Sequence, residues 1–181
     1  MNVVLRPFVE NDIPLKIRWV NDPSVNRYLH YALPLEYEKT LEWFHGLSKR
    51  TGRLDLTIVA DGMPVGTIGL LAIDLVNGSA EYYIMLGEQR GKGIAYAASL
   101  LLMQKAFCEL KLHRLYLFTE AENLPAQRLF ERLHFQKDGC LRDELCRSDR
   151  YVSRFVYSML CEEYHEFYSA DPTDATQLFR R

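Results

Sequence analysis

The segment from residue 80 to about residue 111 constrains the fold more than any other part of the sequence. A strand-like stretch at 80–86 is followed by QRGKGIA at 89–95 and then by a long apolar run. Glycines just before a helix let a phosphate approach the unpaired N–H groups of the first turn. Arg90 and Lys92 add positive charge there. The pattern predicts a strand, a turn suited to a diphosphate, and a helix that packs on the sheet.

The same segment lacks the two common nucleotide-binding motifs. It contains neither G-x-x-x-x-G-K-[ST] nor the dinucleotide pattern G-x-G-x-x-G. A pair of glycines before a helix is, taken alone, more often a simple turn than an anion site. The segment by itself therefore leaves both interpretations open.

An antiparallel meander is predicted for the residues before this turn. Asp-Gly at 61–62 and Asn-Gly at 77–78 separate three strand-like stretches, and such dipeptides favour two-residue hairpin turns. After the turn, a strand, helix and strand follow in sequence, which predicts a parallel crossover within the sheet. The predicted strands are 3–6, 54–60, 64–73, 80–86, 113–119, 135–146 and 150–160, and the predicted helices are 12–20, 24–30, 36–48, 91–111 and 123–133. The fold class is α/β, with a mixed, mostly antiparallel sheet and flanking helices.

Length and composition fit one domain. The 181 residues are 48% hydrophobic and 25% charged, with a net charge of −2, so nothing indicates a nucleic acid or membrane partner. No run of about 18 apolar residues and no signal-peptide pattern is present, which favours a cytoplasmic protein. Four cysteines form no C-x-x-C and accompany no His cluster, so we expect thiols and no metal site. We expect the domain to span residues 1–164, followed by a tail at 165–181 that loses periodicity.

Three separated motifs resemble the GNAT superfamily of N-acetyltransferases. Arg90-x-x-Gly93-x-Ala95 is similar to the R/Q-x-x-G-x-G/A signature, whose backbone amides hold the pyrophosphate of coenzyme A in that family. The segments EYYIML and LHRLYL look like the family's fourth and fifth strands, and N-x-x-A-x-x-x-F-E-x-x-x-F looks like the following helix and its exit. Joint agreement in order and spacing is more specific than any single motif. Within the superfamily, the sequence most resembles the RimJ/RimL-type enzymes, which acetylate protein N-terminal amines, polyamines or amino sugars.

This resemblance implies that acetyl-CoA is the cosubstrate. The backbone of Ile84, Met85 and Leu86 would pair with the pantetheine arm like an added strand. A bulge in that strand would offer an N–H to the thioester oxygen. Asn123 would fix the pantetheine side, although Asn is also a favoured helix N-cap. The diphosphate would be held by Arg90, Gly91, Lys92, Gly93, Ile94 and Ala95.

Glu81 is the candidate general base implied by the resemblance. A carboxylate near the amine can take its proton directly or through water, and an exposed strand glutamate is the alternative. Many relatives carry Tyr at the position of Phe130, where the phenol is the proposed acid for the departing thiolate. Phe cannot donate a proton, so Phe130 would only pack near the sulfur, and Tyr82, Tyr83 and Tyr116 are possible substitutes. A second departure is His134, where the family usually has Gly before Phe135.

The acceptor pocket is expected between residues 22–45 and the last hairpin. Its candidate residues are Tyr28, His30 and Tyr31, with Trp43, Phe44, Glu36, Glu38, Asp143 and Glu144 as further candidates. The acceptor would be a small amine or amino sugar, with a protein N-terminus as another possibility, and the enzyme a monomer or homodimer. Two alternatives remain: a GNAT-like module that binds acyl-CoA without catalysis, and a flavodoxin-like phosphate-binding protein.

Overall fold

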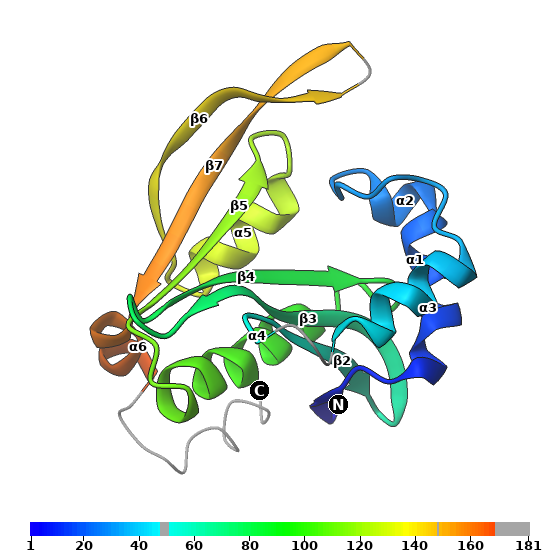
Figure 1. Ribbon diagram of the computed structural model, residues 1–181. Helices are drawn as coiled ribbons and strands as arrows, with labels where there is room; N and C mark the ends of the chain where they lie inside the picture. The colour runs from blue at the N-terminus through cyan, green and yellow to red at the C-terminus, as the bar shows by residue number, and fades with distance from the viewer. Residues whose placement is uncertain (48–50, 148, 169–181) are drawn as a thin grey trace.

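The structure is a computed structural model, which describes residues 1–47, 51–147 and 149–168. Its centre is a seven-stranded sheet with the strand order β1-β2-β3-β4-β5-β7-β6 (Figure 1). Among these strands only β4 and β5 are parallel, and the other neighbours are antiparallel. The strands are β1 (Val3–Pro7), β2 (Leu54–Ala60), β3 (Met63–Asp74), β4 (Ser79–Leu86), β5 (Arg114–Glu120), β6 (Gln136–Arg147) and β7 (Arg150–Leu160). The mixed, mostly antiparallel sheet predicted from the sequence is confirmed.

Helices cover the two faces of the sheet (Figure 1). They are α1 (Ile13–Asn21), α2 (Pro23–Asn26), α3 (Tyr37–His45), α4 (Ile94–Gln104), α5 (Leu124–Arg132) and α6 (Cys161–Tyr168). The main core lies on the α4 side, where Tyr82 and Leu117 pack with Ile94 and Leu102. None of the helices in the described part of the chain is long and apolar enough to cross a membrane.

Strand β4 presents different side chains to the two faces. Tyr82 packs into the α4 core, while Met85 joins a smaller cluster with Trp19 and Val20 of α1. Because side chains alternate along a strand, Glu81, Tyr83 and Met85 share one face. We call this the α1 face, and we call the opposite one the α4 face.

Strands β4 and β5 pair over only three residues before they separate. Their register runs from Ser79 opposite Arg114 to Glu81 opposite Tyr116. Beyond this point β5 continues to pair with β7 as far as Glu120, whereas β4 continues to pair only with β3. The sheet therefore splits, and the edge of β4 from residue 82 to residue 86 is unpaired on the side of β5.

Three element boundaries differ from the sequence-based prediction. The helix expected at 24–30 is the single turn α2, because Pro23 opens it and the backbone leaves the helix after Asn26. Helix α4 ends at Gln104 and continues as a π-helical segment, Lys105–Glu109. The expectation that regular structure ends at residue 164 is wrong for residues 165–168. These residues complete α6, where Phe167 stacks on His134, and residues 169–181 lie outside the described part.

Candidate active site

The split between β4 and β5 creates the first component of the site. The N–H and C=O groups that Ile84, Met85 and Leu86 direct toward β5 find no strand partner there. An unpaired strand edge can accept an extended, amide-bearing ligand as an additional strand. Residues 84–86 thus form an open edge, and pairing of this edge with a pantetheine arm stays a prediction.

The turn from β4 to α4 supplies the second component. Gly91 and Gly93 have φ values of 79° and 78°, in the left-handed region that glycine adopts without strain. A Cβ atom added at either position would meet no described heavy atom within 4 Å. Gly93 is the N-cap of α4 and provides no capping side chain, so the first N–H groups of the helix stay available. This exposed, uncapped helix start fits an anionic group.

The two basic residues of this turn behave differently. The Arg90 guanidinium donates from Nη1 to the Ser24 carbonyl at 2.8 Å and from Nε to the Leu86 carbonyl at 3.3 Å. It therefore ties the turn to α2, which contributes to the positioning of the backbone. Lys92 is exposed, with its ammonium 3.4 Å from the Gln89 side-chain oxygen.

Asn123 and Phe130 fix the position of α5. The Asn123 side-chain oxygen accepts a bond from the Ala126 N–H at 3.3 Å, so Asn123 is the N-cap of α5. Phe130 is buried and contacts the rings of Tyr82, Phe135 and Tyr157. The N-cap role of Asn123 is confirmed, and a role of either residue toward a ligand stays a prediction.

Glu81 lies where the two strands separate. Its side chain is half-buried on the α1 face and makes no hydrogen bond or ion pair with the described residues. Burial raises the pKa of this carboxyl above its usual value, and the charge of Arg154 only partly offsets that effect. A carboxylate without a partner and with a raised pKa is suited to taking a proton from a ligand.

The expected bulge does not fall within residues 84–86. The β3–β4 register is regular from Glu81 to Leu86. Directly after β4, the N–H groups of Gly87 and Glu88 both donate to the Val65 carbonyl, at 2.9 and 3.0 Å, which is the two-against-one pattern of a bulge. An N–H directed at a ligand from residues 82–86 therefore belongs to the open edge, and the bulge lies just beyond it.

A chain of hydrogen bonds crosses the α1 face from β4 to β2. The Tyr83 hydroxyl donates to Asp55 at 2.6 Å, and Asp55 accepts two bonds from Arg53 at 2.5 and 2.8 Å. The Tyr83 ring lies over Gly69 of β3, where an added Cβ would come within 2.9 Å of the hydroxyl. Only glycine at position 69 leaves space for the Tyr83 side chain to pass over β3. The sequence analysis did not identify this chain of bonds, because no local pattern marks contacts across three strands.

The three candidate acceptor residues lie in the loop after α2, but they contact different partners. The Tyr28 hydroxyl donates to the Glu122 carbonyl at 3.1 Å, which links the loop to the start of α5. The His30 Nε2 lies 3.4 Å from the buried Glu120 carboxylate. The Tyr31 ring lies beside Lys16, with 5.7 Å between the ammonium and the ring centroid. A role of these three residues in binding the acceptor stays a prediction.

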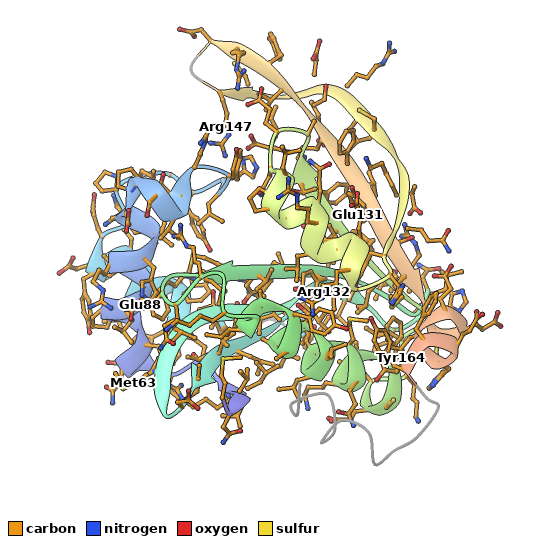
Figure 2. All side chains as sticks on the ribbon, turned by 180° about the vertical axis from the view of Figure 1, so that it is seen from behind. Met63, Glu88, Glu131, Arg132, Arg147 and Tyr164 are labelled. Atoms are coloured by element: carbon orange, nitrogen blue, oxygen red, sulfur yellow. The ribbon has the colours of Figure 1, made fainter. Side chains whose placement is uncertain are left out.

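Arg147, at the end of β6, connects the hairpin to this loop (Figure 2). Its guanidinium donates to the carbonyls of Arg27 and Leu29 at 2.7 and 2.9 Å. Its Nε lies 2.7 Å from the carboxylate of Glu120, of which only 3% is exposed. Burial and the nearby charges of Arg147 and Arg154 lower the pKa of His30. The contact closes the side of the site opposite the β4 edge.

Lys16 of α1 is a charged residue that the sequence analysis did not identify. The residue is 6% exposed, and its ammonium lies 3.4 Å from the Trp43 ring centroid and 5.6 Å from that of Phe8. Burial lowers the pKa of Lys16 to about 8, an effect that the charge of Asp55 opposes. A lysine among aromatic rings gave no signal in the sequence, because its position in α1 fits an ordinary exposed helix face.

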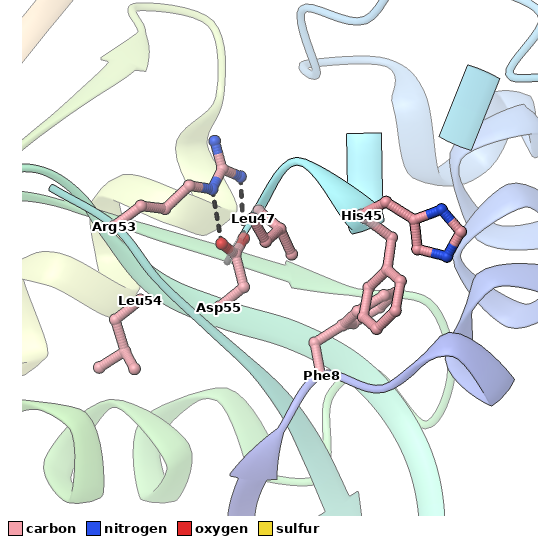
Figure 3. A pocket seen from close by; sticks show the side chains of 7 residues that line it. Phe8, His45, Leu47, Arg53, Leu54 and Asp55 are labelled. Carbon is pink, nitrogen blue, oxygen red and sulfur yellow. Dashed lines mark hydrogen bonds and ion pairs between the residues drawn. The ribbon is translucent and has the colours of Figure 1, made fainter. Parts of the chain in front are cut away.

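A cavity of about 430 Å³ lies next to this aromatic group (Figure 3). In Figure 3 the Arg53–Asp55 ion pair stands on one side of it and Phe8 and His45 on the other. The remaining residues that line it are Phe44, Leu47 and Leu54. The cavity thus joins the α1 face at the Asp55 end of the hydrogen-bonded chain.

The other candidate acceptor residues are occupied or lie apart. Glu36 forms an ion pair with Lys39, and Glu144 binds Arg154 through two hydrogen bonds of 2.5 and 2.6 Å. Glu38 and Asp143 are exposed. Phe44 packs against Phe8.

A split mixed sheet, an open strand edge and a glycine turn at a helix start together form a site suited to an extended, amide-bearing ligand with a diphosphate. Residues 2–136 match the family model described as an acetyltransferase (GNAT) domain. The chain belongs to the GNAT acetyltransferase family. The fold excludes the flavodoxin-like alternative, because such proteins are built on a parallel sheet and here only β4 and β5 are parallel.

Individual relatives agree with this assignment. The chain is 29% identical over 168 residues to the uncharacterized N-acetyltransferase p20 of Bacillus licheniformis, which covers 90% of this chain and 94% of that protein. It is 28% identical to the spermidine N(1)-acetyltransferase of Escherichia coli K12, with 99% of this chain and 95% of the relative covered. The crystal structure of the Vibrio cholerae spermidine N-acetyltransferase in complex with CoA and spermine superposes with a TM-score of 0.84 at 24% identity, covering 90% and 97% of the two chains. This protein is an N-acetyltransferase.

Proposed function

We propose that the protein transfers the acetyl group of acetyl-CoA directly to the primary amine of a small molecule, such as a small amine or amino sugar. In this proposal it is a RimJ/RimL-type enzyme that acts in the cytoplasm as a monomer or homodimer. The observation that carries the proposal is the position of Glu81. This unpaired carboxylate stands where β4 and β5 separate, beside the open strand edge.

The site offers backbone groups that suit two parts of the cosubstrate. The open edge at Ile84, Met85 and Leu86 suits the amides of the pantetheine arm, and the glycine turn suits the diphosphate. Ile94 and Ala95 begin α4 there, so their N–H groups point toward the turn without helical acceptors. Bound in this way, acetyl-CoA would supply an activated thioester near Glu81.

Glu81 would act as the general base. The incoming amine forms the new C–N bond with the acetyl carbonyl carbon, the C–S bond breaks, and the amine loses a proton to Glu81 or to a water molecule that it holds. A carboxylate whose pKa lies above its usual value accepts a proton more readily near neutral pH. The regular edge of β4 would offer backbone N–H groups to the developing oxyanion.

The leaving sulfur would depart as a thiolate, assisted at most by Tyr116, the candidate phenol that stands opposite Glu81 and makes no hydrogen bond with the described residues. Phe130 carries no proton to donate. The Tyr82 hydroxyl lies 2.7 Å from the Ser99 hydroxyl, and the Tyr83 hydroxyl is bound to Asp55, so both phenols are engaged elsewhere. Because an ordinary thiol has a pKa of about 8.5, a thiolate is a tolerable leaving group.

The alternative function is an acyl-CoA-binding module without catalysis, and Phe130 is the observation that favours it. Isotope-labelled acetyl-CoA, incubated with a library of polyamines, amino sugars and N-terminal peptides, distinguishes the two. Transfer of label to an amine, dependent on Glu81, supports the enzyme proposal. Tight binding of CoA with no transfer to any amine would favour the module instead.

A further inference from the structure

The charges on the α1 face are almost all satisfied within the protein. Strands β2, β4 and β5 place three acidic side chains there. Asp55 is bound by Arg53 and Tyr83, and Glu120 lies against Arg147. Glu81 is the acidic side chain of these strands that has no partner among the described residues. A polyamine, with several ammonium groups, would therefore find only one uncompensated carboxylate on these strands.

Lys16 is the unpaired cation of the same face. Its stem is buried, and its ammonium makes no hydrogen bond or ion pair with the described residues. The rings of Trp43, Tyr31 and Phe8 surround it, and aromatic faces attract a cation without accepting its N–H groups as an oxygen would. Its N–H donors are thus not satisfied by an oxygen of the described residues, in a dehydrated setting where a charged hydrogen-bond acceptor binds best.

The local charge near Lys16 is positive. Arg53 approaches the same Trp43 ring, with its guanidinium carbon 5.3 Å from the centroid. Asp55 compensates one of these two cations through its ion pair with Arg53. The remaining charge is that of Lys16, so the surroundings favour an anion over an amine.

A series of neighbouring residues leads from Glu81 to the surroundings of Lys16. Glu81 and Tyr83 lie two residues apart on the same side of β4, and Tyr83 reaches across Gly69 to Asp55. Lys16 lies within reach of the charges of Asp55 and Arg53, and it shares the Trp43 ring with Arg53.

We propose that the acceptor amine carries an anionic group, a carboxylate or a phosphate, and that Lys16 binds this group. The inference rests on the proposed function, since it places the reacting nitrogen at Glu81. Lys16 is then a specificity-determining residue that contacts the acceptor away from the reacting atoms. The enzyme would acetylate amino acids of extended length or amino-sugar phosphates better than polyamines.

Matched pairs of amines test this proposal. Values of kcat/KM are measured for 4-aminobutanoate, 6-aminohexanoate and 8-aminooctanoate against the unsubstituted amines and the diamines of equal length, with glucosamine 6-phosphate against glucosamine as a phosphate pair. We expect a preference of about 10- to 100-fold for the anionic member at the length that fits, which is the range of a charge-assisted hydrogen bond. The two kinds of pair separate carboxylate from phosphate.

Three variants assign the preference to Lys16. Lys16→Met keeps the buried stem and removes the charge, so the anionic-to-neutral ratio should fall to near 1. Lys16→Arg should retain part of the ratio. Lys39→Met removes an exposed lysine of α3 and should leave the ratio as it is.

The outcomes separate this inference from the proposed function. Acetylation of amines with no preference for the anionic member, or a preference that survives in Lys16→Met, overturns the inference while the transfer activity stands. If no amine is acetylated, calorimetry of the CoA-bound protein with glucosamine 6-phosphate and 6-aminohexanoate tests the anion site directly. Binding that depends on Lys16 supports the anion site, and its absence overturns it.

Discussion

Glu81 of β4 stands opposite Tyr116 of β5 in the last residue pair that joins these two strands. One residue further along β4, the partner strand is gone and the edge is open. The position of the proposed base is therefore set by the sheet itself, at the point where a ligand would replace the missing neighbour. Measurable consequences follow for Glu81, the glycine turn, the Arg147 contact and Lys16.

Replacing Glu81 by Gln should lower kcat by roughly 10²- to 10⁴-fold, because the amide cannot accept the proton. The affinity for CoA should barely change, since the open edge and the glycine turn are left intact. Steady-state kinetics and calorimetry with CoA measure the two quantities. Glu166→Gln, an exposed position on α6, is the control. Equal activity of the Glu81 variant and the control would remove Glu81 from the mechanism.

The same variant should be more stable than the wild type at neutral pH. The folded-state pKa of Glu81 is raised, so the folded protein binds the proton more tightly than the unfolded chain does. The stabilisation is present at acidic pH and is lost as the pH rises through the unfolded and then the folded pKa. Thermal unfolding from pH 4 to pH 8 should give the wild type and Glu81→Gln equal Tm values at pH 4. At pH 8, Glu81→Gln should have the higher Tm. A wild type that is the more stable protein at pH 8 would contradict this.

Gly93→Ala should weaken CoA binding by about tenfold or more, because a methyl group would project toward the diphosphate. Gly62 provides a matched control. Its φ is 82°, and an added Cβ there also meets nothing within 4 Å, but it lies in the β2–β3 turn. Both variants should lose a similar amount of stability, about 1 kcal/mol. Calorimetry should show a loss of CoA affinity for Gly93→Ala alone, and an equal affinity for the two variants would exclude the turn from the binding site.

Arg147→Met should destabilise the protein by about 1–3 kcal/mol, because it leaves the buried Glu120 carboxylate with only His30 beside it. Adding Glu120→Gln should restore part of that loss. Urea unfolding of the two single variants and the double variant measures the coupling. Since the contact holds the hairpin to the loop after α2, KM for the acceptor should rise while CoA affinity is kept. Additive effects on stability would show that the two residues act independently.

The preference for an anionic acceptor should weaken as the pH rises above 8. The pKa of Lys16 is about 8, so its charge is present below that pH and is lost above it. Asp55, Arg53 and Tyr31 are the neighbouring charged or titratable groups. Measurement of KM from pH 6.5 to pH 9.5 should show a rise for 6-aminohexanoate that hexylamine does not show. Parallel pH profiles for the two amines would exclude Lys16 from acceptor binding.

Local patterns predicted most of the elements correctly. Dipeptides that favour tight turns placed β2, β3 and β4 to within one residue, and the glycine turn marked the start of α4. The departure at His134 also has a local reason. This residue follows the C-cap of α5 and has a φ of 62°, in the left-handed region that glycine adopts most easily. Its ring stacks on Phe167 of α6, a contact that no local pattern could indicate.

The sequence by itself determined the succession of strands and helices along the chain, the glycine turn before α4 and the family, because turns, helix starts and periodicity depend on neighbouring residues. The tertiary structure decided which charges remain unpaired. Arg147 pairs with Glu120 and Arg154 with Glu144, while Glu81 and Lys16 have no ion-pair partner among the described residues. These outcomes depend on side chains from different elements that meet only in the folded protein, so no local sequence pattern indicates them.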